Sequence, residues 1–313
     1  MTYAILFPGQ GSQSVGMLGA HTAPVISETL QEASQVLGWD VAALMRDGPA
    51  DEMNRTERTQ PLLLAASTAL WRLWQGQDMP APTALAGHSL GEYSALVAAG
   101  ALSFADALKL VELRGQLMQA AVPAGIGGMT ALVGLDDVQV EALCGQWADA
   151  RGSEGVLEPA NYNAPGQVVV AGHVQALEWL EAGAKAAGAR MAVRLSMSVP
   201  SHCSLLRPAA ERLMLRLQET TFHAPVIPVL HNLDGSARDS ADGIRRALCE
   251  QLYRPVRWTQ TIRALGEGGH RRFLECGPGK VLCGLNKRIL KEGEAVTLEA
   301  PEGVEKARTL VAG

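Results

Sequence analysis

The chain has 313 residues, enough for one large domain or two smaller ones, and 47% of them are hydrophobic. Its formal net charge of −5 argues against general binding to nucleic acid, which depends on a basic surface. The five cysteines are an odd number without C-x-x-C spacing, which favours reduced thiols in a cytoplasmic protein over disulfides or a metal site.

The start of the sequence leads directly into a short apolar strand, and no basic segment followed by a long apolar run precedes it. We therefore expect no signal peptide. No apolar run approaches the ~18 residues that a membrane-spanning helix requires, so we expect no membrane partner either.

Strands and helices alternate from the start of the chain, which indicates an α/β architecture. The first strand ends in a loop rich in glycine and amide side chains, and Ser103 is a suitable N-cap for a long amphipathic helix. The expected elements of this part are the strands 3–7 and 83–86 and the helices 24–37, 59–76, 90–99 and 104–120.

A stretch rich in glycine and proline, residues 123–128, precedes a segment with an order of its own. Its expected elements are strand 129–135, helix 137–149, strands 156–161 and 167–171, helix 173–187 and strand 190–195. This βαββαβ order is that of a ferredoxin-like unit. We therefore predict an α/β-hydrolase-like body over 1–126 and 199–313, with an inserted ferredoxin-like subdomain over 127–198.

The residues 87–91, Gly-His-Ser-Leu-Gly, match the pattern G-x-S-x-G between an expected strand and an expected helix. In that context the serine sits on a sharp turn with its hydroxyl exposed at a helix N-terminus, where developing negative charge is favoured. Ser89 is therefore a candidate nucleophile. A tight turn that merely contains a serine is the alternative, and the pattern alone does not decide between them.

A serine nucleophile needs a base, and His202 is the best placed histidine. It lies where the chain re-enters the predicted body, whereas His88 adjoins Ser89 and is expected to play a supporting role. The remaining histidines have ordinary helix or loop contexts and are interpreted as structural: His21, His173, His223, His231 and His270. Because no acidic residue follows Ser89 in a convincing loop before His202, a backbone carbonyl is the expected partner of the imidazole.

Basic residues are concentrated in segment 245–291, which holds eleven arginines and lysines and three acidic residues. Solvated helix faces are the usual explanation of such a run. The alternative is a basic patch, on an otherwise acidic protein, that docks an acidic partner.

The sequence resembles the malonyl-CoA:acyl carrier protein transacylases of bacterial fatty acid synthesis over nearly the whole chain, except the tail beyond about 290. The motifs that carry the resemblance are Phe-Pro-Gly-Gln-Gly-Ser-Gln at 7–13, Thr-Gln-Pro at 59–61, Gly-His-Ser-Leu-Gly-Glu-Tyr-Ser-Ala-Leu at 87–96, Arg114, Asn-Tyr-Asn-Ala-Pro-Gly-Gln at 161–167, Val-Pro-Ser-His at 199–202, Gln-Leu-Tyr-Arg-Pro-Val at 251–256 and Glu-Cys-Gly-Pro-Gly-Lys-Val-Leu at 275–282.

The resemblance implies that Ser89 is the acylated nucleophile and His202 its general base, with the backbone carbonyl of Gln251 orienting the imidazole. It also implies an oxyanion hole formed by the Gln10 side chain and the Leu90 N–H. From the residues alone, Gln10 has no advantage over Gln13 as the amide donor.

Arg114 is implied to bind the malonyl carboxylate, which suits the planar fork of a guanidinium. A surface salt bridge with Glu112 or Asp106 is the alternative for an arginine on a helix. Asn161 is expected to line the same cleft, whereas turn chemistry beside Pro-Gly is preferred for Asn163.

The implied reaction has two half-reactions, acylation of the serine by malonyl-CoA and transfer to the phosphopantetheine thiol of acyl carrier protein. The coenzyme A thioester is a substrate, and no metal or other cofactor is expected. Lys280, Lys287 and Arg288 of segment 245–291 are expected to help dock the acidic carrier. A serine hydrolase or thioesterase, and a non-catalytic or specialised relative such as a loading subunit, are the two alternatives.

Overall fold

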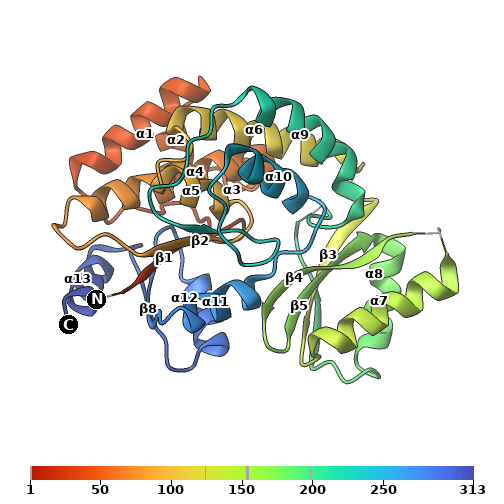
Figure 1. The fold of residues 1–313 in the computed structure, drawn as a ribbon. Coiled ribbons are helices and arrows are strands. Elements are labelled where there is room, and N and C mark those ends of the chain that lie inside the picture. Colours follow the sequence, from red (N-terminus) through yellow and green to blue (C-terminus); the bar gives the residue numbers. More distant parts are fainter. Residues whose placement is uncertain (1, 124, 153–154, 198) are drawn as a thin grey trace.

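The computed structural model (Figure 1) describes residues 2–123, 125–152, 155–197 and 199–313, and its fold is mixed α/β. The larger of its two sheets is parallel, with the strand order β7-β2-β1-β8-β9. Its strands are β1 (Ala4–Phe7), β2 (Ala84–Gly87), β7 (Val229–Leu230), β8 (Arg272–Glu275) and β9 (Glu294–Thr297). All residues of β1 and β2 are buried, as expected for a parallel sheet covered on both faces.

Helices cover both faces of this sheet (Figure 1). One face carries α1 (Pro24–Leu37), α2 (Val41–Asp47), α3 (Ala50–Met53), α4 (Thr56–Gln75), α5 (Gly91–Ala98), α6 (Phe104–Ala121), α9 (Arg207–Glu219) and α10 (Ala241–Gln251). The other carries α11 (Trp258–Glu267) and α12 (Val281–Ile289), whereas the buried residues of α13 (Pro301–Ala312) pack with the core of the first face. The core is mainly aliphatic, and α4 contributes an almost continuous buried face from residue 59 to residue 71.

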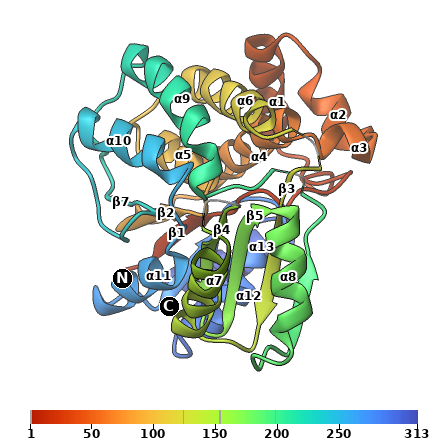
Figure 2. The same cartoon turned by 90° about the vertical axis from the view of Figure 1, so that its right-hand side faces the viewer.

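The smaller sheet is antiparallel, with the strand order β4-β5-β3-β6. Its elements are β3 (Gly127–Val133), α7 (Asp137–Arg151), β4 (Leu157–Ala164), β5 (Gln167–His173), α8 (Val174–Ala184) and β6 (Met191–Arg194). Val168 and Val170 of β5 pack toward the two helices, which lie on the outer face (Figure 2), while Val169 and Ala171 pack with Met129 and Cys203 on the inner face. The period of two along the strand produces this division.

The edge strand β4 is fastened to the rest of the protein by main-chain hydrogen bonds. The Tyr162 N–H donates to the Val256 carbonyl at 2.9 Å, and the Val256 N–H donates to the Ala160 carbonyl at 2.8 Å. The hydroxyl of Thr259 adds a bond of 3.0 Å to the Tyr162 carbonyl. These bonds hold the polar residues of β4 against the carboxyl ends of the parallel strands.

The expected helices and strands are confirmed, with ends that differ by about one to three residues. Ser103 caps α6 as expected, since its hydroxyl accepts from the Asp106 N–H at 3.1 Å. Two short helices between α1 and α4 were not expected. Within the described residues, no helix combines the length and the apolar character needed to cross a bilayer.

Candidate active site

Ser89 lies at the sharp turn between β2 and α5, with a positive φ of 52°. The glycines on either side are required by close backbone approach. A β-carbon at Gly87 would lie 1.9 Å from the carbonyl carbon of Gly91, and one at Gly91 would lie 2.0 Å from the Phe7 carbonyl oxygen. The turn therefore presents Ser89 at the N-terminus of α5, as the G-x-S-x-G pattern requires.

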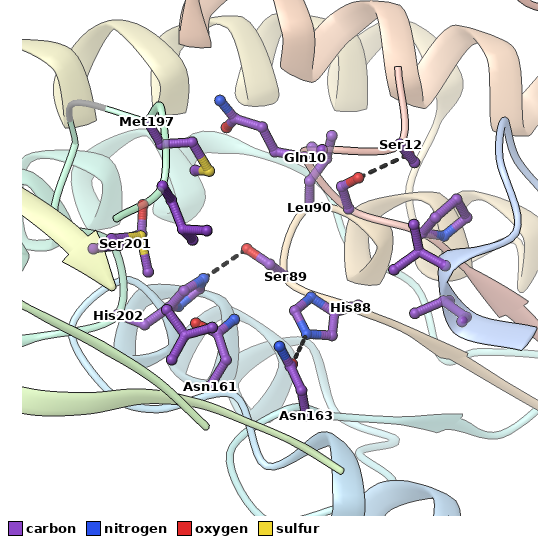
Figure 3. Close-up of a pocket in the computed structure, with 18 of the residues that line it drawn as sticks. Gln10, Ser12, His88, Ser89, Leu90, Asn161, Asn163, Met197, Ser201 and His202 are labelled. Carbon is purple, nitrogen blue, oxygen red and sulfur yellow. Dashed lines mark hydrogen bonds between the residues drawn. The ribbon is translucent and has the colours of Figure 1, made fainter. Parts of the chain in front are cut away.

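His202 lies directly beside Ser89 (Figure 3), with 2.8 Å between its Nε2 and the serine Oγ. Its Nδ1 lies 2.7 Å from the backbone carbonyl of Gln251. A carbonyl only accepts, so Nδ1 carries the proton and Nε2 is left to accept from the serine hydroxyl. The structure thus brings together the three expected groups: Ser89 contacts one ring nitrogen of His202, and the Gln251 carbonyl contacts the other.

Burial lowers the pKa of His202 to about 3, and the nearby positive charge of Arg114 adds to the effect. The imidazole is therefore neutral, and able to act as a base, throughout the physiological pH range. Because the unfolded chain takes up this proton near its ordinary pKa and the native state does not, His202 reduces stability as pH falls from about 6.5 toward 3.

This low pKa predicts the pH profile of acylation. We expect kcat/KM for any reaction that uses Ser89 as nucleophile and His202 as base to stay nearly constant from pH 8 to pH 5, since this parameter reports the free enzyme. A histidine of ordinary pKa would lose about 30-fold of its neutral form over the same range. Rapid-mixing measurements of the release of the leaving group check the profile, and a fall centred near pH 6.5 would contradict it.

Arg114 on α6 is only 1% exposed and lies in the site, not on the surface. Its Nη1 donates to the side-chain oxygen of Gln60 at 2.8 Å, and its Nη2 donates to the side-chain oxygen of Gln251 at 3.0 Å and to Ser89 Oγ at 3.3 Å. The alternative of a surface salt bridge is wrong, because Glu112 accepts instead from the Trp39 indole. Among the described residues, no carboxylate pairs with Arg114.

A buried network of hydrogen bonds supports the turn that carries Ser89. Glu92 is 0% exposed, and its carboxylate lies 2.6 Å from Nδ1 of His231 and accepts from the Asn232 N–H and the Gln251 side-chain amide, each at 2.9 Å. The Asn232 side chain accepts from the Ser89 N–H at 2.7 Å and donates to the Gly87 carbonyl at 2.6 Å. Sequence reasoning missed Asn232, and nothing in its local pattern distinguishes it from a turn asparagine.

The two expected oxyanion donors both line the pocket. Leu90 follows the nucleophile at the start of α5, where a backbone N–H is available for such a role. The Gln10 amide extends toward the side of Met197 and not toward Ser89 (Figure 3). The side chain of Gln13 instead stabilises the loop after β1. It accepts from the Gly11 N–H at 2.8 Å and donates to the Asn54 side chain at 2.9 Å.

Two asparagines of β4 face the site. Asn161 is 7% exposed and lines the pocket, and its side-chain oxygen has no hydrogen-bond partner among the described residues. Asn163 lies 2.8 Å from Nε2 of His88 (Figure 3), so the interpretation of Asn163 as a turn residue is wrong. The strand continues to residue 164, and the turn is confined to Pro165 and Gly166.

The site lies in a cavity of about 170 Å³ between the two sheets. Its apolar lining comes from Met118, Met129, Val169, Leu195, Met197, Val281, Leu282 and Leu285. Helix α12 therefore forms one wall, and the exposed Lys280 and Lys287 lie at its start and in its last turn. Arg288 is partly structural, because it donates to the side chain of Gln167 and to the Pro165 carbonyl.

Comparison with known proteins finds similarity over almost the whole chain. The model of the acyl transferase domain family matches residues 4–308. The malonyl CoA-acyl carrier protein transacylase of Salmonella typhimurium is 51% identical over 309 residues, which are 98% of this chain and 99% of the relative.

Two solved structures extend this similarity to three dimensions. The malonyl CoA-acyl carrier protein transacylase from Coxiella burnetii has a TM-score of 0.97 at 44% identity, covering 100% of this chain and 98% of the other. A malonyl-transacylase in complex with a type II PKS acyl-carrier protein has a TM-score of 0.96 at 47% identity and covers 100% of both chains.

Proposed function

Because the chain belongs to the acyl transferase domain family, we propose that it transfers the malonyl group of malonyl-CoA to the phosphopantetheine thiol of an acyl carrier protein. The family resemblance expected from the motifs is confirmed. The observation that carries the proposal is the placement of Arg114, a buried cation without a carboxylate partner among the described residues, 3.3 Å from Oγ of Ser89.

The first half-reaction acylates the serine. Nε2 of His202 accepts the hydroxyl proton while Oγ attacks the thioester carbonyl, and the Gln251 carbonyl stabilises the imidazolium that forms. The Leu90 N–H stabilises the oxyanion, joined by the Gln10 amide once that side chain turns toward Ser89. The proton then passes from His202 to the departing coenzyme A thiolate.

The second half-reaction reverses these roles. His202 takes the proton of the carrier thiol, the thiolate attacks the malonyl ester, and the proton returns to Oγ of Ser89. Because coenzyme A leaves before the carrier reacts, the kinetics are ping-pong. The thioester itself supplies the activated acyl group, so no metal or other cofactor takes part in either step.

Arg114 selects the acyl group. A malonyl group on Ser89 carries a free carboxylate two bonds from the ester carbon, within reach of a guanidinium that touches Oγ. Asn161 also lines the pocket and has an unsatisfied side-chain oxygen that can accept from an amide N–H of the pantetheine arm. Bidentate pairing with a carboxylate favours malonyl over acetyl groups.

We also propose that the fold divides into a catalytic body and an inserted subdomain. The order β4-β5-β3-β6 and the βαββαβ sequence of elements support a ferredoxin-like subdomain over 127–198. The parallel sheet with a strand–serine–helix turn supports an α/β-hydrolase-like body over 1–126 and 199–313. We further propose that the protein acts in the cytoplasm, where it supplies malonyl groups for fatty acid chain elongation.

The proposed function is tested by supplying malonyl-CoA with and without a phosphopantetheinylated acyl carrier protein. We expect malonyl-carrier to form at the rate of coenzyme A release, and release without carrier to stop after about one equivalent. Continued release without carrier would identify a hydrolase or thioesterase. Acylation followed by no transfer would indicate a specialised relative with a different acceptor.

The carrier is expected to dock on the part of segment 245–291 that adjoins the pocket. Charge reversal of both Lys280 and Lys287 should raise the KM for an acidic carrier about tenfold, an effect that weakens with salt, while acylation by malonyl-CoA stays the same. Steady-state kinetics of each half-reaction check this, with the exposed Lys306→Glu as a matched control. Unchanged carrier kinetics would refute the docking site.

A further inference from the structure

The buried guanidinium of Arg114 is held by two neutral side-chain amides. Gln60 reaches it from α4 and Gln251 from α10, and both glutamines are 0% exposed. A carboxylate is the more common partner of a buried arginine, because it compensates the charge that has been removed from water. Two buried side chains therefore position the guanidinium of Arg114 without neutralising its positive charge.

The direction of the Gln251 amide is fixed by its surroundings. Its Nε2 donates to the carboxylate of Glu92 at 2.9 Å and to the Ser89 carbonyl at 3.0 Å, and both of these groups only accept. Its oxygen must therefore face Arg114. Glu92, the nearby buried carboxylate, is thus separated from the guanidinium by one amide group and receives donors of its own.

The Gln60 amide is directed in a similar way. Its Nε2 points to the sulfur of Met118 at 3.4 Å, which leaves its oxygen to accept from Nη1 of Arg114 at 2.8 Å. A glutamate would fit the same volume and would pair directly with the guanidinium. Glutamine and glutamate would therefore differ at this position in charge and not in shape.

The positive charge of Arg114 remains unmatched by direct contact within the described residues. Burial lowers the pKa of Arg114, but a guanidinium stays protonated at neutral pH. Its Nε also has no hydrogen-bond partner in the described part of the chain. A buried cation with unused donors is a strong site for a carboxylate that arrives with the substrate.

We propose that Gln60 determines specificity: its neutral amide positions Arg114 while leaving the guanidinium charge free for the carboxylate of the acyl group. The inference rests on the proposed function and deepens it. It predicts that a carboxylate placed at position 60 competes with the substrate for Arg114 and removes the preference for a carboxylated acyl group.

The test is Gln60→Glu, measured as kcat/KM for acylation of Ser89 by malonyl-CoA and by acetyl-CoA. We expect the ratio of kcat/KM for malonyl-CoA to kcat/KM for acetyl-CoA to fall about 10- to 100-fold, mainly because the value for malonyl-CoA falls. This decrease corresponds to the loss of one ion pair between Arg114 and the substrate carboxylate. The melting temperature should not fall, because the new carboxylate compensates a buried cation.

Two further variants make the result specific to charge. Gln60→Met keeps a similar volume but has neither a strong acceptor nor a charge, so its ratio should change much less than that of Gln60→Glu. In a background of Arg114→Ala, Gln60→Glu should lower the ratio no further, because the two residues act through one contact. An unchanged ratio in Gln60→Glu, or an equal fall in Gln60→Met, would overturn the inference.

The wild-type protein separates this inference from the function on which it rests. If Ser89 is not acylated, or shows no preference for malonyl-CoA, the proposed function fails and the inference fails with it. If the wild type prefers malonyl-CoA and Gln60→Glu keeps that preference, only the role of Gln60 is refuted.

Discussion

His202→Ala is expected to lower the rate of Ser89 acylation by about 10³- to 10⁶-fold. The imidazole is the group placed to accept the serine proton, with 2.8 Å between Nε2 and Oγ. Without it the hydroxyl, which is a weak nucleophile at its ordinary pKa, is left without a base. Single-turnover mixing with malonyl-CoA, followed by coenzyme A release, measures the effect.

The control for this variant is His223→Ala, which removes an exposed histidine of the same chain. Thermal unfolding of both variants shows whether the fold is retained. Acylation by folded His202→Ala within tenfold of the wild-type rate would mean that another group serves as the base. The assignment of His202 as the base of Ser89 would then be wrong.

Arg114→Ala is expected to lower kcat/KM for malonyl-CoA by about 10²- to 10³-fold, because it removes the buried partner of the substrate carboxylate. The value for acetyl-CoA should change far less, since an acetyl group has no charge to pair. Parallel acylation rates with the two thioesters give the ratio directly.

Arg216→Ala is the matched control, because this arginine is 39% exposed and pairs with Glu219 on the surface of α9. Equal losses for malonyl-CoA and acetyl-CoA in Arg114→Ala would contradict carboxylate binding. They would instead assign Arg114 to the support of the Ser89 turn, which it also contacts.

The nucleophile could be located from the sequence because its signal is local. The strand, the turn and the helix follow one another within a few residues, and both glycines are required because an added β-carbon would lie only 1.9 Å or 2.0 Å from neighbouring backbone atoms. The βαββαβ order of the smaller sheet and its helices could also be predicted, because each element has a local sequence periodicity of its own. His202 could be proposed as the base only from the family resemblance and from its position where the chain re-enters the predicted body.

The support of the site could not be predicted, because it depends on tertiary contacts between distant residues. Asn232 lies 143 residues from the serine N–H that it binds, and Gln60 lies 54 residues from Arg114. Gln60 lies in the Thr-Gln-Pro motif at 59–61, but no spacing rule links either amide side chain to its partner. Only the fold brings them together.

The error at Asn163 has a similar cause. An asparagine near Pro-Gly is typical of a turn, but pairing between β4 and β5 continues as far as Ala164 and Gln167. The strand therefore keeps Asn163 and directs its side chain to His88. The short helices α2 and α3, with seven and four residues, are too brief to show a clear periodicity.

The most direct test of the account is the intact mass of the protein after brief mixing with malonyl-CoA, with acetyl-CoA as the parallel sample. A transferase with Ser89 as its nucleophile should show one malonyl adduct that is absent in Ser89→Ala, and little acetyl adduct. If no adduct forms while coenzyme A accumulates, water reaches the ester, and the protein is a hydrolase and not a transferase.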